Sequence, residues 1–314
     1  MVLSRASEQN YLYVINYPLQ EKELCLLEMK SLFDKDLTKK YLFSSRNIAP
    51  SRSPFIKLRI SILYTSSSLE ELVQILIDEK MTCNNFKFAR FKVEEGRLDY
   101  ATWMQSVTEL GRVILGEVDM KNPSTQLGVT LIEDQWIFGI YDKNENPWEK
   151  HNLKPYTNSN SLETRTARAI VNIAVGVQVQ TRLVDPCCGI GTVVLEALSL
   201  AIPVIGYEIS WIITEQAKKN VSYFGYENCI VQGDINKITE RYEVAILDLP
   251  YGLFSGITQK QQKDIINSAR QITRKLVIIT CMDMDEDITS AGFSIVDRCT
   301  VNKGNFVRFV RVCY

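Results

Sequence analysis

The chain has 314 residues, which is longer than one typical folding core and too short for three full-sized ones, so we expect two domains or one domain with a small added module. Its 36 basic and 37 acidic side chains nearly cancel, so net charge alone gives no reason to expect a nucleic-acid partner. The one histidine, His151, excludes a histidine-rich metal site and a catalytic site built from several histidines.

The eight cysteines are spread along the chain without any C-x-x-C pair. A chain of this length with cysteines among apolar residues needs no disulfide framework, so we expect reduced thiols, no metal site and a cytoplasmic location. The start of the chain lacks the basic-then-apolar pattern of a secretory signal, and no apolar run approaches the ~20 residues that cross a bilayer. We therefore expect no membrane association, and the oligomeric state stays open.

The first part of the chain alternates short strands with helices. The patterns predict strands at 11–17, 55–64 and 86–93, and helices at 19–33 and 67–80. Ser67 or Ser68 precedes a glutamate by the spacing of a capping box, which favours a helix start there. The order β-α-(β)-β-α-β is typical of a ferredoxin-like module, which we place at residues 1–80.

A second small module follows at residues 81–155. Residues 102–118 predict an amphipathic helix, and 125–133 with 135–142 predict a hairpin. The asparagine- and proline-containing segment 143–161 is the most loop-like stretch, so we place a domain boundary inside it.

Residues 161–176 then predict a helix that is capped by Ser161 and that turns Thr164 and Arg165 toward solvent. From residue 182 onward, apolar runs alternate with helical patterns, which is typical of an open α/β sheet. Helices are expected near 192–201, 211–224, 258–273 and 284–291, and the last two runs predict an antiparallel pair at the sheet edge. We place this α/β domain at residues 156–314.

Residues 35–59 concentrate positive charge in a chain that is neutral overall. The stretch holds one acid, Asp36, and seven basic residues with aromatic residues between them: Lys35, Lys39, Lys40, Arg46, Arg52, Lys57 and Arg59. Such a stretch suits a face that contacts phosphates, and an ordinary solvated face is the alternative.

A glycine-containing turn follows the first α/β strand, in the sequence Asp185-Pro-Cys-Cys-Gly189-Ile-Gly191. Ligands of open α/β sheets bind at the carboxyl ends of the strands, and glycines let the backbone approach them. A dinucleotide fingerprint would have glycine where Val194 stands, and Asp185 would repel a pyrophosphate. A cationic cofactor with an amino group fits better, and S-adenosylmethionine is one; the alternative is a purely structural turn.

Two further acids end the next two strands. Glu208 could accept two ribose hydroxyls, and Asp234 could accept the amino group of an adenine. Either acid alone could be a cap or a surface group. Three acids at three successive strand ends point to one ligand site.

The fourth strand ends in Asp248-Leu-Pro-Tyr251-Gly252. A planar amine is a poor nucleophile because its lone pair is delocalised, so a site that methylates it must hold its N–H groups and aim the nitrogen in line. Asp248 and the backbone carbonyl of Leu249, exposed by the turn at Pro250, supply two acceptors. Tyr251 supplies a face on which a base can stack. The alternative is an Asp-Pro turn with a packed tyrosine.

These motifs resemble those of a known family. DPCCGIGT (185–192) resembles motif I, and DLPYG (248–252) resembles motif IV, of the amino-group methyltransferases that use S-adenosylmethionine. The aspartate form followed by glycine is similar to the guanine-N2 tRNA methyltransferases that carry a THUMP domain. VDMKNPSTQLGVTL (118–131) resembles the THUMP signature, and residues 153–174 resemble the family's linker and the helix after it.

The resemblance implies a Rossmann-like α/β methyltransferase domain behind an N-terminal ferredoxin-like module and a THUMP α+β module. It implies transfer of a methyl group from S-adenosylmethionine to the N2 amine of a tRNA guanosine, with position 10 as the first expectation. The residues it implies for the cofactor are Asp185, Cys188, Gly189, Gly191, Glu208 and Asp234. Those it implies for catalysis are Asp248, Leu249, Pro250 and Tyr251. The N-terminal modules are then expected to grip tRNA, with stretch 35–59 as the first place for phosphate contacts.

Three positions depart from the family pattern. Ile190 stands where serine or threonine is usual, Glu208 replaces an aspartate, and Leu249 replaces the first proline of D-P-P-Y. Methylation of adenine N6 or of a ribosomal RNA guanine, and a non-catalytic RNA-binding protein that kept the fold, are the alternatives. A nucleotide-dependent reductase is a more distant one.

Overall fold

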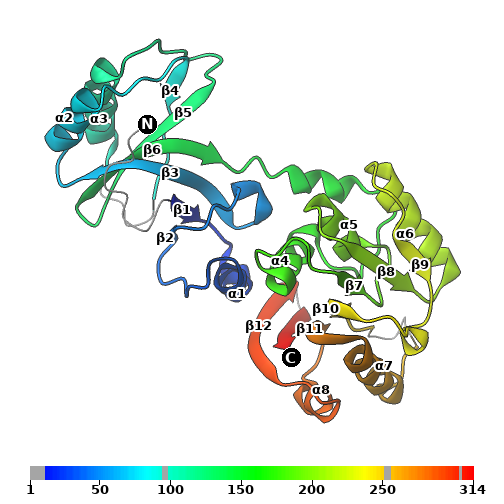
Figure 1. The fold of residues 1–314 in the computed structure, drawn as a ribbon. Helices are drawn as coiled ribbons and strands as arrows, with labels where there is room; N and C mark the ends of the chain where they lie inside the picture. The colour runs from blue at the N-terminus through cyan, green and yellow to red at the C-terminus, as the bar shows by residue number, and fades with distance from the viewer. Residues whose placement is uncertain (1–10, 94–97, 251–255, 304–305) are drawn as a thin grey trace. The chain divides into compact units, whose positions relative to one another are not determined.

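The computed structural model describes residues 11–93, 98–250, 256–303 and 306–314. The chain divides into two units, one of residues 1–16 and 37–145 and one of residues 17–36 and 146–314 (Figure 1). A segment that lies between the first two strands in sequence therefore belongs to the second unit. Within the described residues, no helix is both long and apolar enough to cross a membrane.

The first unit is built on a six-stranded sheet in the order β2-β1-β3-β6-β5-β4. Its strands are β1 (Tyr11–Ile15), β2 (Tyr41–Ser44), β3 (Ile56–Ser66), β4 (Phe86–Phe88), β5 (Thr125–Ile132) and β6 (Gln135–Lys143). Helices α2 (Leu69–Asp78) and α3 (Tyr100–Val113) bury leucines against the sheet, where Leu72 and Leu110 share one core with Phe138. Burial of these side chains supplies most of the drive for the two helices to form.

Most of the elements predicted for the first unit are confirmed. Ser68 caps α2, because its hydroxyl accepts a hydrogen bond from the backbone N–H of Glu71 at 3.1 Å. Helix α3 ends at Val113 and not at residue 118, because the chain after it turns extended and Leu115 forms a bridge with Thr82. The pairing of β3 with β6 joins strands from both sides of residue 80, so the two expected N-terminal modules contribute to one sheet.

The second unit is built on a seven-stranded sheet in the order β12-β13-β11-β10-β7-β8-β9. Its strands are β7 (Leu183–Asp185), β8 (Val204–Glu208), β9 (Ile230–Gln232), β10 (Tyr242–Asp248), β11 (Thr273–Thr280), β12 (Ile295–Lys303) and β13 (Phe306–Cys313). Strands β7 to β11 run parallel, and β12 and β13 form the antiparallel pair at the edge. The predicted open α/β sheet is confirmed.

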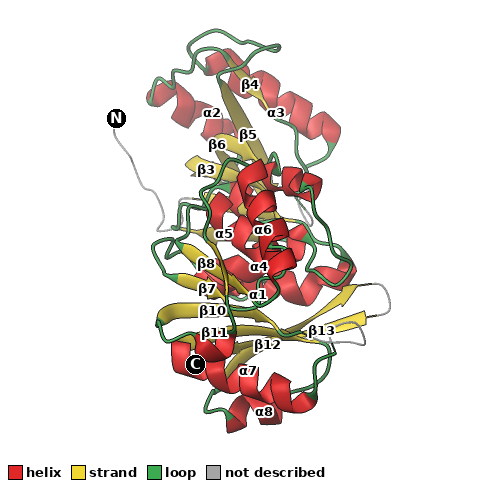
Figure 2. Ribbon diagram, turned by 90° about the vertical axis from the view of Figure 1, so that its right-hand side faces the viewer, coloured by secondary structure: helices red, strands yellow, loops and turns green. Residues whose placement is uncertain are grey.

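Helices cover both faces of this sheet (Figure 2). Helices α4 (Thr164–Val175), α5 (Thr192–Ser199) and α6 (Trp211–Tyr223) lie on one face, and α7 (Gln259–Ile272) and α8 (Asp285–Ser290) lie on the other. Ile266 and Ala269 of α7 pack with Leu276 and Ile278 of β11 in one buried core. Both faces are covered, as a parallel sheet requires.

Helix α1 (Lys22–Phe33), which follows the short helix η1 (Leu19–Glu21), belongs to this second unit. It packs against α4 and β12. Glu28 is fully buried, and its carboxylate accepts a hydrogen bond at 2.7 Å from the side-chain amide of Asn172 in α4. Glu23 accepts hydrogen bonds at 2.7 Å from the backbone N–H and the hydroxyl of Thr300 in β12.

The start of α4 differs from the sequence prediction. The residue before its first turn is Glu163, and Ser161 is not the cap. Thr164 is 2% exposed and donates a hydrogen bond to the side chain of Asn152, and Arg165 pairs with Glu21 at 3.1 Å. Both side chains find partners in segments that lie outside the helix, so the pattern of the helix alone did not reveal these contacts or the burial of Thr164.

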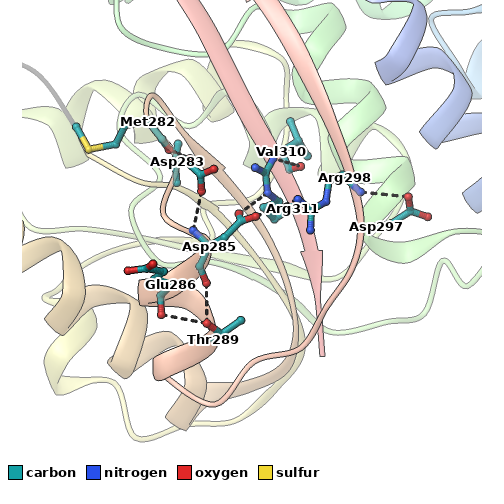
Figure 3. A network of polar contacts seen from close by, with 10 residues as sticks. Met282, Asp283, Asp285, Glu286, Thr289, Asp297, Arg298, Val310 and Arg311 are labelled. Carbon is teal, nitrogen blue, oxygen red and sulfur yellow. Dashed lines mark hydrogen bonds and ion pairs between the residues drawn. The ribbon is translucent and has the colours of Figure 1, made fainter.

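The edge pair β12–β13 is tied to α8 through one carboxylate (Figure 3). Asp285 binds Arg298 of β12 at 3.0 Å and Arg311 of β13 at 2.6 Å. Burial alone would raise the pKa of Asp285, but the hydrogen bond and charge of Arg311 and the charge of Arg298 outweigh it and hold that pKa below its ordinary value.

Candidate functional site

The carboxyl ends of the parallel strands place the first predicted acid at the base of a cavity. Asp185 ends β7 and is 2% exposed. Its carboxylate accepts a hydrogen bond from the backbone N–H of Cys187 at 3.3 Å. Burial raises the pKa of Asp185 well above its ordinary value, with a smaller contribution from the charges of Asp248 and Glu208. A bound cation would reverse this effect.

The turn after β7 needs its two glycines. Gly189 and Gly191 have φ angles of 52° and 82°, a region that side chains with a Cβ disfavour. Gly191 is the N-cap of α5, and the backbone N–H of Cys188 is held by the carbonyl of Tyr207 at 2.8 Å. Burial raises the pKa of the Cys187 and Cys188 thiols, so these two groups stay protonated at neutral pH.

Glu208, at the end of β8, braces this turn. One of its carboxylate oxygens accepts a hydrogen bond from the N–H of Gly189 at 3.1 Å, and the other accepts one from the N–H of Ser210 at 2.8 Å. Each carboxylate oxygen has two acceptor positions, so both retain capacity for a ligand hydroxyl. The side chain is therefore at once a brace and an available acceptor.

Asp234 follows β9 at the same edge of the sheet. Its carboxylate accepts hydrogen bonds at 2.9 Å from both the backbone N–H and the side-chain amide of Asn236, and so caps the short helix η4 (Ile235–Lys237). Gly233, just before it, donates its N–H to the carbonyl of Glu208 at 3.0 Å. The ends of β8 and β9 are thus joined by a backbone–backbone hydrogen bond.

The turn after β10 carries the predicted acceptor residues. Asp248 ends the strand, and the N–H of Leu249 continues the pairing with β11 by donating to the carbonyl of Ile279 at 3.0 Å. The carbonyl of Pro250 accepts a hydrogen bond from the side-chain amide of Gln262 at 2.9 Å. Tyr251, the predicted stacking residue, lies outside the described residues.

These strand ends surround one cavity of about 810 Å³. Eight predicted site residues line it: Asp185, Cys188, Gly189, Glu208, Asp234, Asp248, Leu249 and Pro250. Gly191 does not line it and shapes the turn instead. The described lining holds five carboxylates, which are the four just named and Asp264, and it holds no lysine, arginine or histidine.

One wall of the cavity was not predicted. Residues 158–162, in the loop-like segment before α4, line it. The side chain of Asn220 in α6 holds this segment by bonding both the N–H and the carbonyl of Tyr156, and it also bonds the carbonyl of Ile190. The buried Arg308 of β13 donates to the carbonyl of Asn160 at 2.7 Å. The cluster of small polar residues at 158–161 was the only sequence signal for this wall.

Thr192 also lines the cavity and was not singled out from the sequence. It is the first residue of α5 and is 4% exposed. Its buried hydroxyl has no hydrogen-bond partner among the described residues. A buried hydroxyl without a partner costs free energy, so a ligand that bonds to it is favoured. Ile190, where the family pattern has a hydroxyl, is itself buried.

The basic stretch 35–59 is partly neutralised by acids. Lys39 pairs with Glu133 at 2.6 Å, and Arg59 pairs with Asp142 at 3.1 Å and lies over the ring of Tyr11. Contact of this stretch with phosphates therefore stays a prediction.

Comparison with known proteins bears on the second unit above all. Residues 151–291 match the family model described as "RMKL-like, methyltransferase domain". The tRNA (guanine(10)-N2)-dimethyltransferase of Methanothermobacter thermautotrophicus is 25% identical over 164 residues, which cover 49% of this chain and 48% of that protein. The enzyme of the same name from Pyrococcus abyssi is 30% identical over 197 residues, which cover 58% of this chain and 59% of that protein.

Among solved structures, TrmN from Thermus thermophilus superposes with a TM-score of 0.49 at 16% identity, over 96% of this chain and 98% of that one. The chain spans about half to three fifths of the length of the two curated relatives that it matches. The family match begins in the segment before α4 and runs through β7 to α8, and so includes every described strand end that forms the cavity. Over residues 151–291 the chain is therefore similar to the RMKL-like methyltransferase domain.

Proposed function

We propose that this chain transfers a methyl group from S-adenosylmethionine to the exocyclic N2 amine of a guanosine in tRNA. The observation that carries the proposal is the acidic cavity. Its described lining holds five carboxylates and no basic side chain, and it includes the turn after β10 with its hydrogen-bond acceptors. Such a lining favours a ligand that carries positive charge and amino groups, and it disfavours one that carries phosphates.

The residues of the cavity fit the cofactor. S-adenosylmethionine supplies a methyl group activated by a positively charged sulfur. The buried carboxylate of Asp185 is suited to an ammonium group, Glu208 to ribose hydroxyls and Asp234 to the adenine amino group. The unpartnered hydroxyl of Thr192 provides a further polar contact in the same wall.

The acceptor turn fits the second substrate. Asp248 and the carbonyl of Leu249 accept the two N–H groups of the amine, and Tyr251 stacks on the base. As the N–C bond forms, the bond between the methyl carbon and the sulfur of the cofactor would break, the sulfur would leave as a neutral thioether, and Asp248 would receive the proton that the amine loses. The target base must leave its stack to reach this turn, which costs a few kcal/mol.

The nucleic-acid substrate is proposed from the relatives. Both curated relatives are named for guanosine 10 of tRNA, which supports tRNA as the substrate class and position 10 as the first nucleotide to test. The first unit, which holds residues 37–59 of the basic stretch, is proposed to bind the tRNA, and a cytoplasmic location is proposed from that substrate.

The test is incubation with S-adenosylmethionine labelled in its methyl group and with undermodified bulk tRNA, followed by nucleoside analysis and mapping of the label. Label in N2-methylguanosine supports the proposal. Label in N6-methyladenosine would move the target to adenine, and no label in any RNA, with no cofactor binding by calorimetry, would overturn the proposal.

A further inference from the structure

The turn after β10 is held at two points, one on each side of the Leu249 carbonyl. Before it, the N–H of Leu249 donates to the carbonyl of Ile279 in β11. After it, the carbonyl of Pro250 accepts the hydrogen bond from Gln262. Among the described residues, the Leu249 carbonyl itself accepts no hydrogen bond, and Leu249 lines the cavity.

Gln262 is rigidly placed. It lies in the first turn of α7, where Thr258 and Gln261 form a reciprocal capping box that fixes the start of the helix. One turn later, Ile266 is fully buried in the core against the sheet. Gln262 itself is 6% exposed, so its amide cannot rely on water for hydrogen bonds. The helix thus presents a fixed donor to the turn.

We propose that Gln262 is a positioning residue for methyl transfer. By pinning the Pro250 carbonyl to α7, it holds the peptide between Leu249 and Pro250 so that the Leu249 carbonyl is presented to the cavity. Gln262 does not line the cavity and so acts through the turn, not on the substrate. The assignment rests on the proposed function, because it supposes that the Leu249 carbonyl accepts an N–H of the target amine.

The chemistry of the contact makes the assignment testable. Methionine at position 262 has a similar length and no N–H donor. Glutamate has the same shape, but its carboxylate meets the Pro250 carbonyl as acceptor against acceptor, and only its protonated form can donate. A Gln262→Glu enzyme should therefore regain the contact as the pH falls.

The experiment compares Q262M and Q262E with the wild type and with Q271M. Gln271 is exposed near the other end of α7, so Q271M controls for the substitution itself. For Q262M we expect kcat to fall by about 10- to 100-fold, as for a misplaced catalytic group, with the Kd for S-adenosylmethionine within about twofold of wild type. Burial and the facing Pro250 carbonyl should raise the pKa of the introduced glutamate above its ordinary value of about 4.3, so for Q262E kcat relative to wild type should rise as the pH is lowered from about 8.5 toward that pKa.

A second readout does not depend on activity. Hydrogen–deuterium exchange of the peptide that contains Leu249 should be faster in Q262M than in the wild type or Q271M. The assignment would be overturned if Q262M kept the kcat of the wild type and the exchange rate of the Leu249 peptide did not change. It would also be overturned if Q262M lost affinity for S-adenosylmethionine by the same factor as it lost kcat. If the wild type methylates no RNA, the proposed function fails, and the exchange rates still decide whether Gln262 holds the turn.

Discussion

The carboxylate of Glu208 reaches across the sheet edge to the backbone N–H of Gly189, 3.1 Å away, while its other oxygen holds Ser210. The end of β8 and the turn after β7 are therefore joined by one side chain. Glutamate in place of the family's aspartate gains the extra methylene that this span uses.

Shortening this side chain should loosen the turn. In Glu208→Asp the carboxylate cannot hold both N–H groups, and the loss of a hydrogen bond to a charged group costs about 1.5–3 kcal/mol. We expect the Kd for S-adenosylmethionine to rise by roughly tenfold or more, measured by calorimetry. Glu215→Asp, at an exposed position of α6, is the control and should bind as the wild type does. Unchanged affinity for S-adenosylmethionine in Glu208→Asp would show that the hydrogen bonds of Glu208 to Gly189 and Ser210 do not support cofactor binding.

Asp185 should destabilise the protein that has no cofactor bound. Because burial raises its pKa above the unfolded value of about 3.9, the folded state binds more protons than the unfolded state between these two pKa values, and stability falls as the pH rises through that window. Asparagine does not titrate, so the Asp185→Asn variant should not lose stability in this way as the pH rises. Its free energy of unfolding in urea should match that of the wild type near pH 4 and exceed it by pH 8.

The same variant should bind S-adenosylmethionine more weakly, because the proposed ammonium group loses its charged partner. A variant that is less stable than the wild type at pH 8 without cofactor would contradict the role of burial at Asp185.

Asp248 and Tyr251 should be needed for methyl transfer but not for cofactor binding. We expect Asp248→Ala and Tyr251→Ala to lower kcat by about 100-fold or more, since each removes a group that is proposed to hold or stack on the target base. The Kd for S-adenosylmethionine should stay within about twofold of wild type. Turnover like that of the wild type in both variants would show that the acceptor turn is not where the amine binds.

A buried charge network should control the stability of the second unit. Glu196 is fully buried and lies 2.5 Å from His151 and 3.0 Å from Arg168. Glu196→Ala removes the buried carboxylate that pairs with the charge of Arg168, so we expect a loss of about 3–5 kcal/mol in the free energy of unfolding.

The matched control is Glu215→Ala, which breaks an exposed pair with Lys218 on α6 and should cost less than about 1 kcal/mol. Urea unfolding followed by circular dichroism measures both variants. Equal losses in the two would mean that the buried network adds no stability.

The sequence predicted the parts of the site that local patterns encode. Strand periodicity located β7, β8, β9 and β10, and the rule that parallel strands end at one edge brought Asp185, Glu208, Asp234 and Asp248 to one cavity. The wall at 158–162 and the contact of Gln262 were not predicted. Both depend on side chains that bond to backbone groups distant in sequence, such as Asn220 to Tyr156, and no periodicity records such pairs.

The membership of α1 in the second unit was equally hidden. Its apolar stripe predicts a buried face and does not say which core will cover that face. Only the partners at α4 and β12 decide this, and they lie far along the chain.

Synthesis on the ribosome gives that distance a consequence in time. Glu23 of α1 and its partner Thr300 are 277 residues apart. At translation rates of about 5–20 residues per second, Thr300 is therefore synthesised roughly 15–55 s after Glu23. Helix α4 is synthesised earlier, so during that interval α1 lacks only its contact with β12. A fragment of residues 146–314 would lack α1, which belongs to the second unit, and so could not form this contact.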